Sequence, residues 1–130
     1  MTLHVELVSP EQVLYSGDAE MVICRTTDGE IAFLTGHAPF VGALGIAAVT
    51  IRSGGDDTRA AVHGGFVEVS HDRVTILSDV AEMADQIDLA RAERQRDDAE
   101  AKLRETHDAE GEAALRRAHV RIELARELGR

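Results

Sequence analysis

The chain has 130 residues and a formal net charge of −10, and its only aromatic residues are three Phe and one Tyr. Binding to phosphate needs clustered basic side chains and stacking on bases needs aromatic ones, so this composition argues against a nucleic-acid partner. At this length the chain holds one ordinary domain, or a small domain with an appendage. The charge is uneven, because residues 1–84 contain 12 Asp and Glu against 4 Arg, whereas residues 85–130 contain 12 acidic against 10 basic residues.

Three features concern the environment of the chain. Cys24 is the single cysteine, which rules out an internal disulfide, fits a reducing compartment and, in an alternating strand pattern, is expected to be buried and inert. The N-terminus lacks a basic region followed by an apolar core, so we expect no signal peptide. Residues 31–51 carry no Asp, Glu, Lys or Arg, but three Gly, a Pro and a His interrupt them. We therefore expect two buried strands and a turn there, and no direct membrane insertion.

Alternating short stretches predict that the first part of the chain is built from β-strands. Leu3, Val5 and Leu7 alternate with polar residues, and the same period-2 pattern returns several times before residue 78. Many short strands separated by turns indicate a β-sandwich or barrel. The expected turns lie at 16–18, 53–57 and 70–73, with a break or bulge at Gly64-Gly65. The expected strands cover residues 3–7, 13–15, 19–26, 45–52, 59–63, 66–69 and 74–77.

The sequence DGEIAFLTGHAPFVGALG, from Asp28 to Gly45, stands out among these stretches. Gly36 can adopt backbone angles barred to other residues, and Pro39 fixes its own φ and restricts the residue before it. We expect a stiff loop between two strands, with Glu30 and His37 as its polar groups. Loops of this kind on a β scaffold often carry binding residues, although a purely structural hydrogen bond is the alternative role for His37.

The pattern changes near residues 79–85, and the remainder predicts an antiparallel pair of helices. Asp85 or Asp88 is a suitable N-cap for the first helix, and Leu89, Ala92, Ala99 and Leu103 recur on one face. A break at 106–108 precedes a second helix from about Glu112 to Leu128. The small Ala residues would let the two helices approach closely.

The second helix carries two apolar stripes on roughly opposite faces. One stripe serves the contact with the first helix, and the other requires a further partner, either the sandwich or a separate protein. Two docking surfaces on one helix also suit an element that moves between them. The stripes are Leu115, Ala118, Ile122 and Ala125, and Val120, Leu124 and Leu128.

Motifs of catalysis are missing from the sequence. There is no phosphate-binding G-x-x-x-x-G-K-[ST] loop, the only lysine is Lys102 in a predicted helix, and no G-x-S-x-G occurs. The six histidines lack the spacing of a zinc site, so we expect no metal and no catalytic residues.

Five stretches, in one order over the whole chain, resemble the epsilon subunit of bacterial F-type ATP synthase. They are VSPEQVLYSG (8–17), the loop with TGHAP, GGFVEV (64–69), VTILSDVAE (74–82) and IDLARA (87–92). The usual family loop reads Pro-Gly-His-Ala-Pro, and Thr35 stands at its first position here.

The resemblance implies a non-catalytic central-stalk subunit that couples proton translocation to ATP synthesis. It implies a β-sandwich, residues 1–84, packed on the gamma subunit and on the c-ring, and a two-helix hairpin, residues 85–130, that inhibits ATP hydrolysis by extending toward the catalytic alpha/beta hexamer. It also implies a peripheral position on the cytoplasmic face of the bacterial cell membrane. The c-ring contact would consist of Glu30, His37, Ala38 and Pro39.

Some members of the resembled family bind regulatory ATP at an I/L-D-x-x-R-A motif and at R-A-x-x-R in the second helix. The matching residues here are Glu82, Ile87, Asp88, Arg91, Arg117 and Arg121. Asp98 stands where the family has a further arginine, and a carboxylate there opposes a triphosphate. We therefore expect at most weak regulatory ATP and no required cofactor; an ordinary helix cap with surface ion pairs is the alternative.

A different class of protein is the second hypothesis for the function. The sandwich would then be a stand-alone ligand-binding domain or metal-dependent enzyme, with the helical hairpin used for dimerisation. Bound metal or a deep apolar pocket would favour this hypothesis, whereas co-purification with a large membrane ATPase would favour the first.

Overall fold

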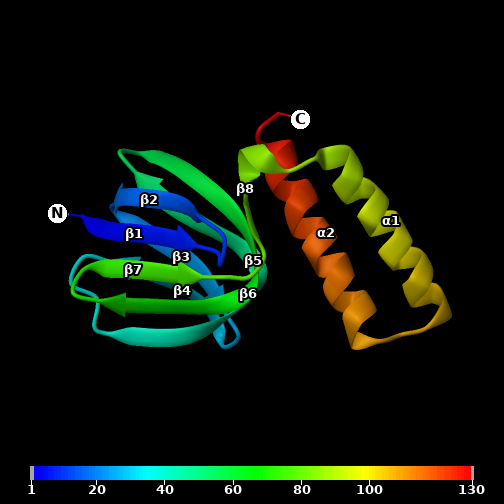
Figure 1. Cartoon of the computed structure of the whole chain (residues 1–130), viewed down its shortest axis with the longest axis horizontal. Helices are drawn as coiled ribbons and strands as arrows, with labels where there is room; N and C mark the ends of the chain where they lie inside the picture. Colours follow the sequence, from blue (N-terminus) through cyan, green and yellow to red (C-terminus); the bar gives the residue numbers. More distant parts are fainter. Residues whose placement is uncertain (1, 130) are drawn as a thin grey trace.

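In the computed structural model, which describes residues 2–129, the strands form a sandwich and the two helices lie beside it as a hairpin (Figure 1). This arrangement confirms the expected fold class. The strands are β1 (Leu3–Val8), β2 (Val13–Ala19), β3 (Met21–Thr26), β4 (Gly29–Leu34), β5 (Phe40–Ser53), β6 (Asp56–Ser70), β7 (Arg73–Leu77) and β8 (Ala81–Met83). A 3₁₀ turn, η1 (Ala84–Gln86), leads to α1 (Leu89–Glu105) and α2 (Ala109–Glu127).

One continuous path of hydrogen-bonded strands builds both layers of the sandwich. Its order is β2-β1-β7-β6-β5-β3-β4, and β8 pairs with β6. The neighbours are antiparallel except β1 and β7, which run parallel. The long strands β5 and β6 contribute to both layers: β6 pairs with β8 in its first half and with β7 in its second, and β5 stays paired with β6 along its length.

The bend in β6 lies at Gly64 and Gly65, where φ is 89° and 117°. A Cβ at Gly65 would lie 2.0 Å from the carbonyl oxygen of Leu77, so only glycine fits. The predicted break or bulge is absent from this part of the described chain, since the β5–β6 register is unchanged across it. The glycines bend the strand without ending it.

A turn predicted at residues 16–18 is also wrong, because these residues belong to β2. Ser16, Gly17 and Asp18 lie opposite Glu6, Val5 and His4 of β1. Pairing with a distant strand overrides the local preference of Ser, Gly and Asp for turns.

Inward-facing residues of both layers form the main core. They come from every second position of the strands, as the alternation in Leu3, Val5 and Leu7 predicted. Burial raises the pKa of the Cys24 thiol to about 12, in agreement with the expected inert cysteine. The buried cluster comprises Leu3, Val5, Leu7, Ala19, Val22, Cys24, Phe33, Leu44, Val49, Ile51, Ala60, Val62, Val67, Val69, Val74 and Ile76.

Aspartates cap both helices. Asp88 Oδ1 accepts the backbone N–H of Arg91 at 3.1 Å, which selects Asp88 over Asp85 as the cap of α1. Asp108 Oδ1 accepts the N–H of Gly111 at 2.7 Å, so α2 begins at Ala109, before the predicted start. Within residues 2–129, neither helix is long and apolar enough to cross a membrane.

The hairpin docks on the sandwich through α2. Leu124 and Ala125 are buried in a second cluster with Ala61, Ala84 and Ile87. Val120 is partly buried against this cluster, whereas Leu128 is 54% exposed. In this conformation, the sandwich is therefore the partner of Val120 and Leu124 in the second stripe.

Candidate functional site

Five of the six residues implied for nucleotide binding line one cavity where α1, α2 and β8 meet. The cavity has a volume of about 300 Å³ and lies at the start of α1. Arg117 is not among its lining residues and pairs with Glu110 at 2.7 Å. The lining residues are Val80, Glu82, Gln86, Ile87, Asp88, Arg91, Gln95 and Arg121.

Glu82 is the centre of the contacts across this cavity. Arg121 Nε donates to Glu82 Oε1 at 2.5 Å, and Arg121 Nη1 donates to Gln95 Oε1 at 3.2 Å. His63 Nε2 lies 3.5 Å from the same carboxylate oxygen, and the His63 side chain is 2% exposed. The Glu82 carboxylate on β8 therefore lies between Arg121 of α2 and His63 of β6, and Gln95 of α1 holds the same arginine.

The pKa of Glu82 is lowered to about 2 by the neighbouring His63 and Arg121, against burial, which raises it. Neither ring nitrogen of His63 makes a hydrogen bond within the described residues. Arg121 donates a hydrogen bond to Glu82 and is therefore the partner that keeps this carboxyl group ionised. Glu82 is therefore ionised at neutral pH.

The charges in the cavity do not favour a triphosphate. Two carboxylates, Glu82 and Asp88, face two guanidinium groups, Arg91 and Arg121. Arg121 is already paired, so a phosphate group would have to displace Glu82 from it. As it stands, the arrangement holds the hairpin on the sandwich.

Sequence reasoning missed His63 and Gln95. Gln95 lies one helical turn after Arg91, so its position on the same helical face was a usable signal. The approach of His63 depends on the bend at Gly64 and Gly65 and has no local signal.

The residues implied for the c-ring contact lie on β4 and in the 35–39 loop. Glu30 is exposed on β4, opposite Arg25 of β3, and Ala38 and Pro39 are exposed in the loop. His37 is half-buried, and its Nδ1 lies 2.7 Å from the carbonyl oxygen of Ala38. That local contact is the structural alternative expected for His37.

Aromatic packing holds the 35–39 loop against the core. The rings of Phe33 and His37 are 4.9 Å apart between centroids and meet edge to face. The Phe40 ring lies 5.6 Å from Phe33. The loop is therefore a shaped surface, as its sequence predicted.

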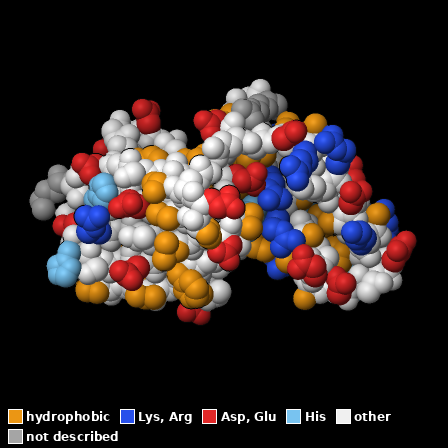
Figure 2. All heavy atoms as spheres, viewed as in Figure 1, with side chains coloured by type: hydrophobic (Ala, Val, Ile, Leu, Met, Phe, Trp, Pro, Cys, Tyr) orange, Lys and Arg blue, Asp and Glu red, His pale blue; other side chains and the backbone are white. Residues whose placement is uncertain are grey.

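An exposed apolar row crosses five strands at the C-terminal end of β7, which is the end away from the 35–39 loop. Its residues are register neighbours on the outer side of the layer, and Phe66 and Leu77 in it are 59% and 49% exposed. Figure 2 shows hydrophobic side chains gathered over this part of the sandwich. The apolar row consists of Val13, Val8, Leu77, Phe66 and Ala43.

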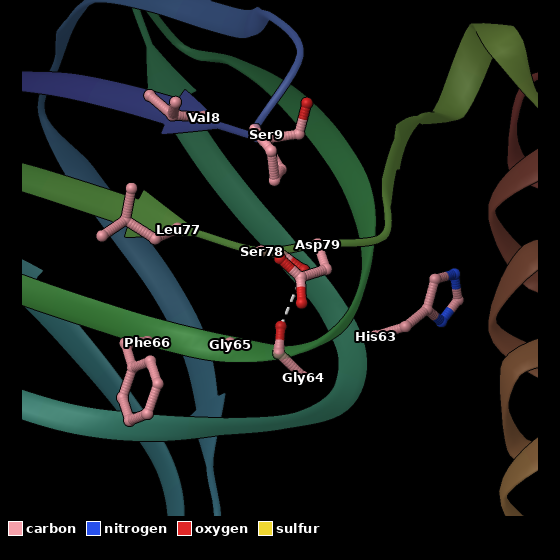
Figure 3. Close-up of a pocket in the computed structure, with 10 residues that line it drawn as sticks. Val8, Ser9, His63, Gly64, Gly65, Phe66, Leu77, Ser78 and Asp79 are labelled. Carbon is pink, nitrogen blue, oxygen red and sulfur yellow. Dashed lines mark hydrogen bonds between the residues drawn. The ribbon is translucent and has the colours of Figure 1, made fainter.

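A cavity of about 450 Å³ adjoins the apolar row at the bend of β6. Figure 3 shows Phe66 and Leu77 on one side of it, while the His63 ring points away toward α2. Ser78 Oγ donates to the carbonyl oxygen of Gly64 at 2.7 Å and fixes the bend.

In residues 2–129, no three His, Cys, Asp or Glu residues gather closely enough to hold a metal ion.

Comparison with known proteins gives the same family throughout. The family model "ATP synthase, Delta/Epsilon chain, beta-sandwich domain" matches residues 2–84. The ATP synthase epsilon chain of Streptomyces avermitilis is 45% identical over 122 residues, 92% of each chain. That of Halalkalibacterium halodurans is 40% identical over 129 residues, which cover 95% of this chain and 97% of the relative.

A solved structure shares the fold. A chain of the Euglena gracilis mitochondrial ATP synthase, in a structure of OSCP, F1 and c-ring, superposes with a TM-score of 0.81 at 24% identity, covering 95% of this chain and 81% of that one. These findings support the stalk-subunit hypothesis and not the stand-alone sandwich. The chain therefore belongs to the ATP synthase delta/epsilon family, as an epsilon-type, non-catalytic subunit of the central stalk.

Proposed function

We propose that the sandwich of this chain joins the gamma subunit to the c-ring of ATP synthase, and that its hairpin regulates ATP hydrolysis. The observation that carries the proposal is a pair of exposed surfaces on one rigid sandwich. The apolar row lies at Leu77, one end of β7, and the 35–39 loop lies beside the β6–β7 turn at the other end. The five residues of β7 place the two surfaces roughly 13 Å apart along the strand.

The apolar row is the surface proposed for the gamma subunit. Exposed contiguous apolar residues on a small domain mark protein interaction sites. Glu6 lies two residues before Val8 on β1 and Glu68 two residues after Phe66 on β6, each opposite Thr75, so two acidic groups lie beside the row, Glu6 being paired with Arg73. A partner surface with an apolar centre and basic residues on that side fits this arrangement.

The 35–39 loop, with Glu30, is the surface proposed for the c-ring. Its exposed residues are small or polar, and aromatic packing behind it keeps its shape. A stiff loop loses little conformational freedom on binding, which favours contact with polar loops of a partner. The acidic Glu30 would require a positively charged or hydrogen-bond-donating group opposite it.

The hairpin is proposed to act as a switch between a folded and an extended position. In the folded position α2 buries Leu124 and Ala125 against the sandwich. Extension toward the catalytic alpha/beta hexamer would uncover these residues and offer them to that partner. The folded form would leave ATP hydrolysis uninhibited, and regulatory ATP would bias it only weakly, because the cavity is neutral in charge.

This proposal puts the chain at the cytoplasmic face of a bacterial cell membrane as a peripheral subunit. The placement follows from attachment to the c-ring and not from an anchor of its own.

Binding to purified gamma subunit tests the main contact. A variant with Phe66→Ser and Leu77→Ser should bind gamma at least about tenfold more weakly, since two large apolar contacts are lost. The matched control is Leu34→Ser, because Leu34 is 50% exposed on β4 and lies outside the apolar row. Equal affinities of the double variant and the control would refute the gamma contact.

The proposed c-ring contact and the proposed hairpin switch have separate tests. Glu30→Ala with His37→Ala should weaken attachment to the c-ring, and a thermal melt checks that the double variant still folds, because the His37 ring packs on Phe33. Deletion of residues 85–130 should raise ATP hydrolysis by the assembled enzyme and leave proton coupling intact. Unchanged hydrolysis after the deletion would exclude the switch.

A further inference from the structure

The 35–39 loop begins with a tight turn whose conformation depends on one residue far away in sequence. The N–H of His37 donates to the carbonyl oxygen of Leu34 at 3.1 Å, and Gly36 between them has a φ of 85°. Positive φ at the third position defines a type II turn, in which proline is favoured at the second position. That position holds Thr35, whose φ is not fixed by a ring.

Asp72 supplies the restraint that the turn lacks. Its Oδ1 accepts the backbone N–H of Gly36 at 2.7 Å, although the two residues are 36 positions apart. The N–H of Gly36 belongs to the central peptide of the turn, and a flip of that peptide converts type II into type I. A charged acceptor on one side therefore holds the peptide in the type II orientation.

Asp72 is itself held firmly. It lies in the two-residue β6–β7 turn, where His71 and Asp72 have φ of 51° and 59°. This pair of positive values is typical of a type I′ hairpin turn, and Asp and Asn tolerate it better than most residues. The carbonyl oxygen of Asp72 also accepts the N–H of His4 at 2.8 Å. The side chain thus projects from a position that β1, β6 and β7 define together.

We propose that Asp72 is a positioning residue for the 35–39 loop, and that its carboxylate presents His37, Ala38 and Pro39 in the geometry that the c-ring contact requires. This inference rests on the proposed c-ring contact of the loop. It predicts that Asp72 affects attachment without touching the c-ring.

The position of Asp72 allows a matched pair of substitutions. Asp72→Asn and Asp72→Gly both tolerate positive φ, but only Asn keeps an oxygen that can accept from Gly36. His71→Gly is the control, because it changes the same turn without removing the bond to the loop. Thr35→Pro should compensate for the loss of Asp72, since proline favours the type II turn at that position.

The first measurement is amide hydrogen exchange in the purified 130-residue chain. Asp72→Gly should speed exchange of the Gly36 amide by about tenfold, while Asp72→Asn and His71→Gly change it less than threefold. The second measurement is attachment of the same variants to c-ring-containing membranes. Asp72→Gly should weaken attachment severalfold, and addition of Thr35→Pro should restore it.

The outcomes separate the inference from the proposed function. The inference would be overturned if Asp72→Gly left the exchange of the Gly36 amide unchanged. It would also be overturned if Asp72→Gly exchanged faster but attached fully, while the double variant Glu30→Ala with His37→Ala attached weakly. If that double variant also attaches normally, the c-ring contact itself is wrong and the inference falls with it. A thermal melt of each variant identifies any that fail to fold. If Asp72→Gly fails to fold, the double variant Asp72→Asn with Thr35→Pro tests the inference, because its attachment should match that of the parent chain. Weak attachment of that folded variant would overturn the inference.

Discussion

Arg121 of α2 and Glu82 of β8 form one of the ion pairs that join the hairpin to the sandwich, with Nε 2.5 Å from Oε1; Arg59 of β6 and Glu127 of α2 form another. The pair is largely enclosed, since the two side chains are 18% and 31% exposed. Gln95 of α1 holds the same guanidinium from the other side. Both helices are therefore connected to one carboxylate, and the predictions below follow from that connection.

Glu82→Gln should loosen the hairpin. The substitution keeps the shape but removes the charge, which weakens a hydrogen bond between charged groups by about 1–3 kcal/mol. Energy transfer between dyes at Glu11→Cys and His107→Cys measures the folded fraction. Native Cys24 will not compete for the dyes, because it is 1% exposed and burial raises its pKa to about 12.

The control for this substitution is Arg117→Gln. Arg117 pairs with Glu110 of the same helix, so its substitution leaves the pair between Glu82 and Arg121 in place. If both variants open the hairpin equally, the Glu82–Arg121 pair has no special part in holding it.

Acid should release the hairpin in a defined range of pH. The pKa of Glu82 is about 2 in the folded position and 4.5 in its ordinary state. A lowered pKa contributes stability that is complete above pH 4.5 and is lost as the pH falls through 2. The dye-labelled chain should show a loss of the folded fraction in that range that Glu82→Gln lacks. Identical acid profiles for parent and variant would contradict the assignment to Glu82.

Leu124→Ala should destabilise the folded position more than any exposed substitution on α2. Leu124 is 1% exposed among Ala61, Ala84 and Ile87, and removal of a buried leucine side chain costs about 2–5 kcal/mol. Leu128→Ala, at a site 54% exposed, should change stability by less than about 0.5 kcal/mol. Urea titration of the dye-labelled chain compares the two, and similar midpoints would show that α2 does not dock through Leu124.

ATP should bind only weakly to the purified chain. Arg121 is paired with Glu82, and Asp98 of α1 stands where the resembled family has a further arginine. We expect calorimetry to show no saturation below roughly millimolar ATP, an affinity of about 4 kcal/mol. Micromolar binding that Arg91→Ala abolishes would contradict the prediction of weak binding.

Local signals in the sequence were sufficient for much of the fold. Alternation in Leu3, Val5 and Leu7 predicted a buried strand face, and Asp88 was one of two expected caps. The shaped loop around Gly36 followed from the backbone limits of Gly and Pro. In each of these cases the physical cause lies within a few residues of the feature.

Features that depend on distant partners could not be predicted in this way. The composition of Ser16–Asp18 predicts a turn, but pairing with β1 makes these residues part of a strand. Gly64-Gly65 predicts a break, but the strand continues there with Leu77 packed beside it. The approach of His63 to Glu82 and the bond from Asp72 to Gly36 join residues 19 and 36 positions apart. Sequence patterns identified five of the residues in the cavity, but not the pairing that occupies Arg121.

The continuity of β5 and β6 through both layers has a mechanical consequence. From Phe40↔Val69 to Ser53↔Asp56 the two strands keep one register. Sliding one layer over the other would have to break backbone hydrogen bonds of this ladder, and not merely shear apolar side chains past each other. Torque applied at the 35–39 loop, next to Phe40, is thus transmitted through covalent and hydrogen-bonded backbone to Phe66 in the apolar row.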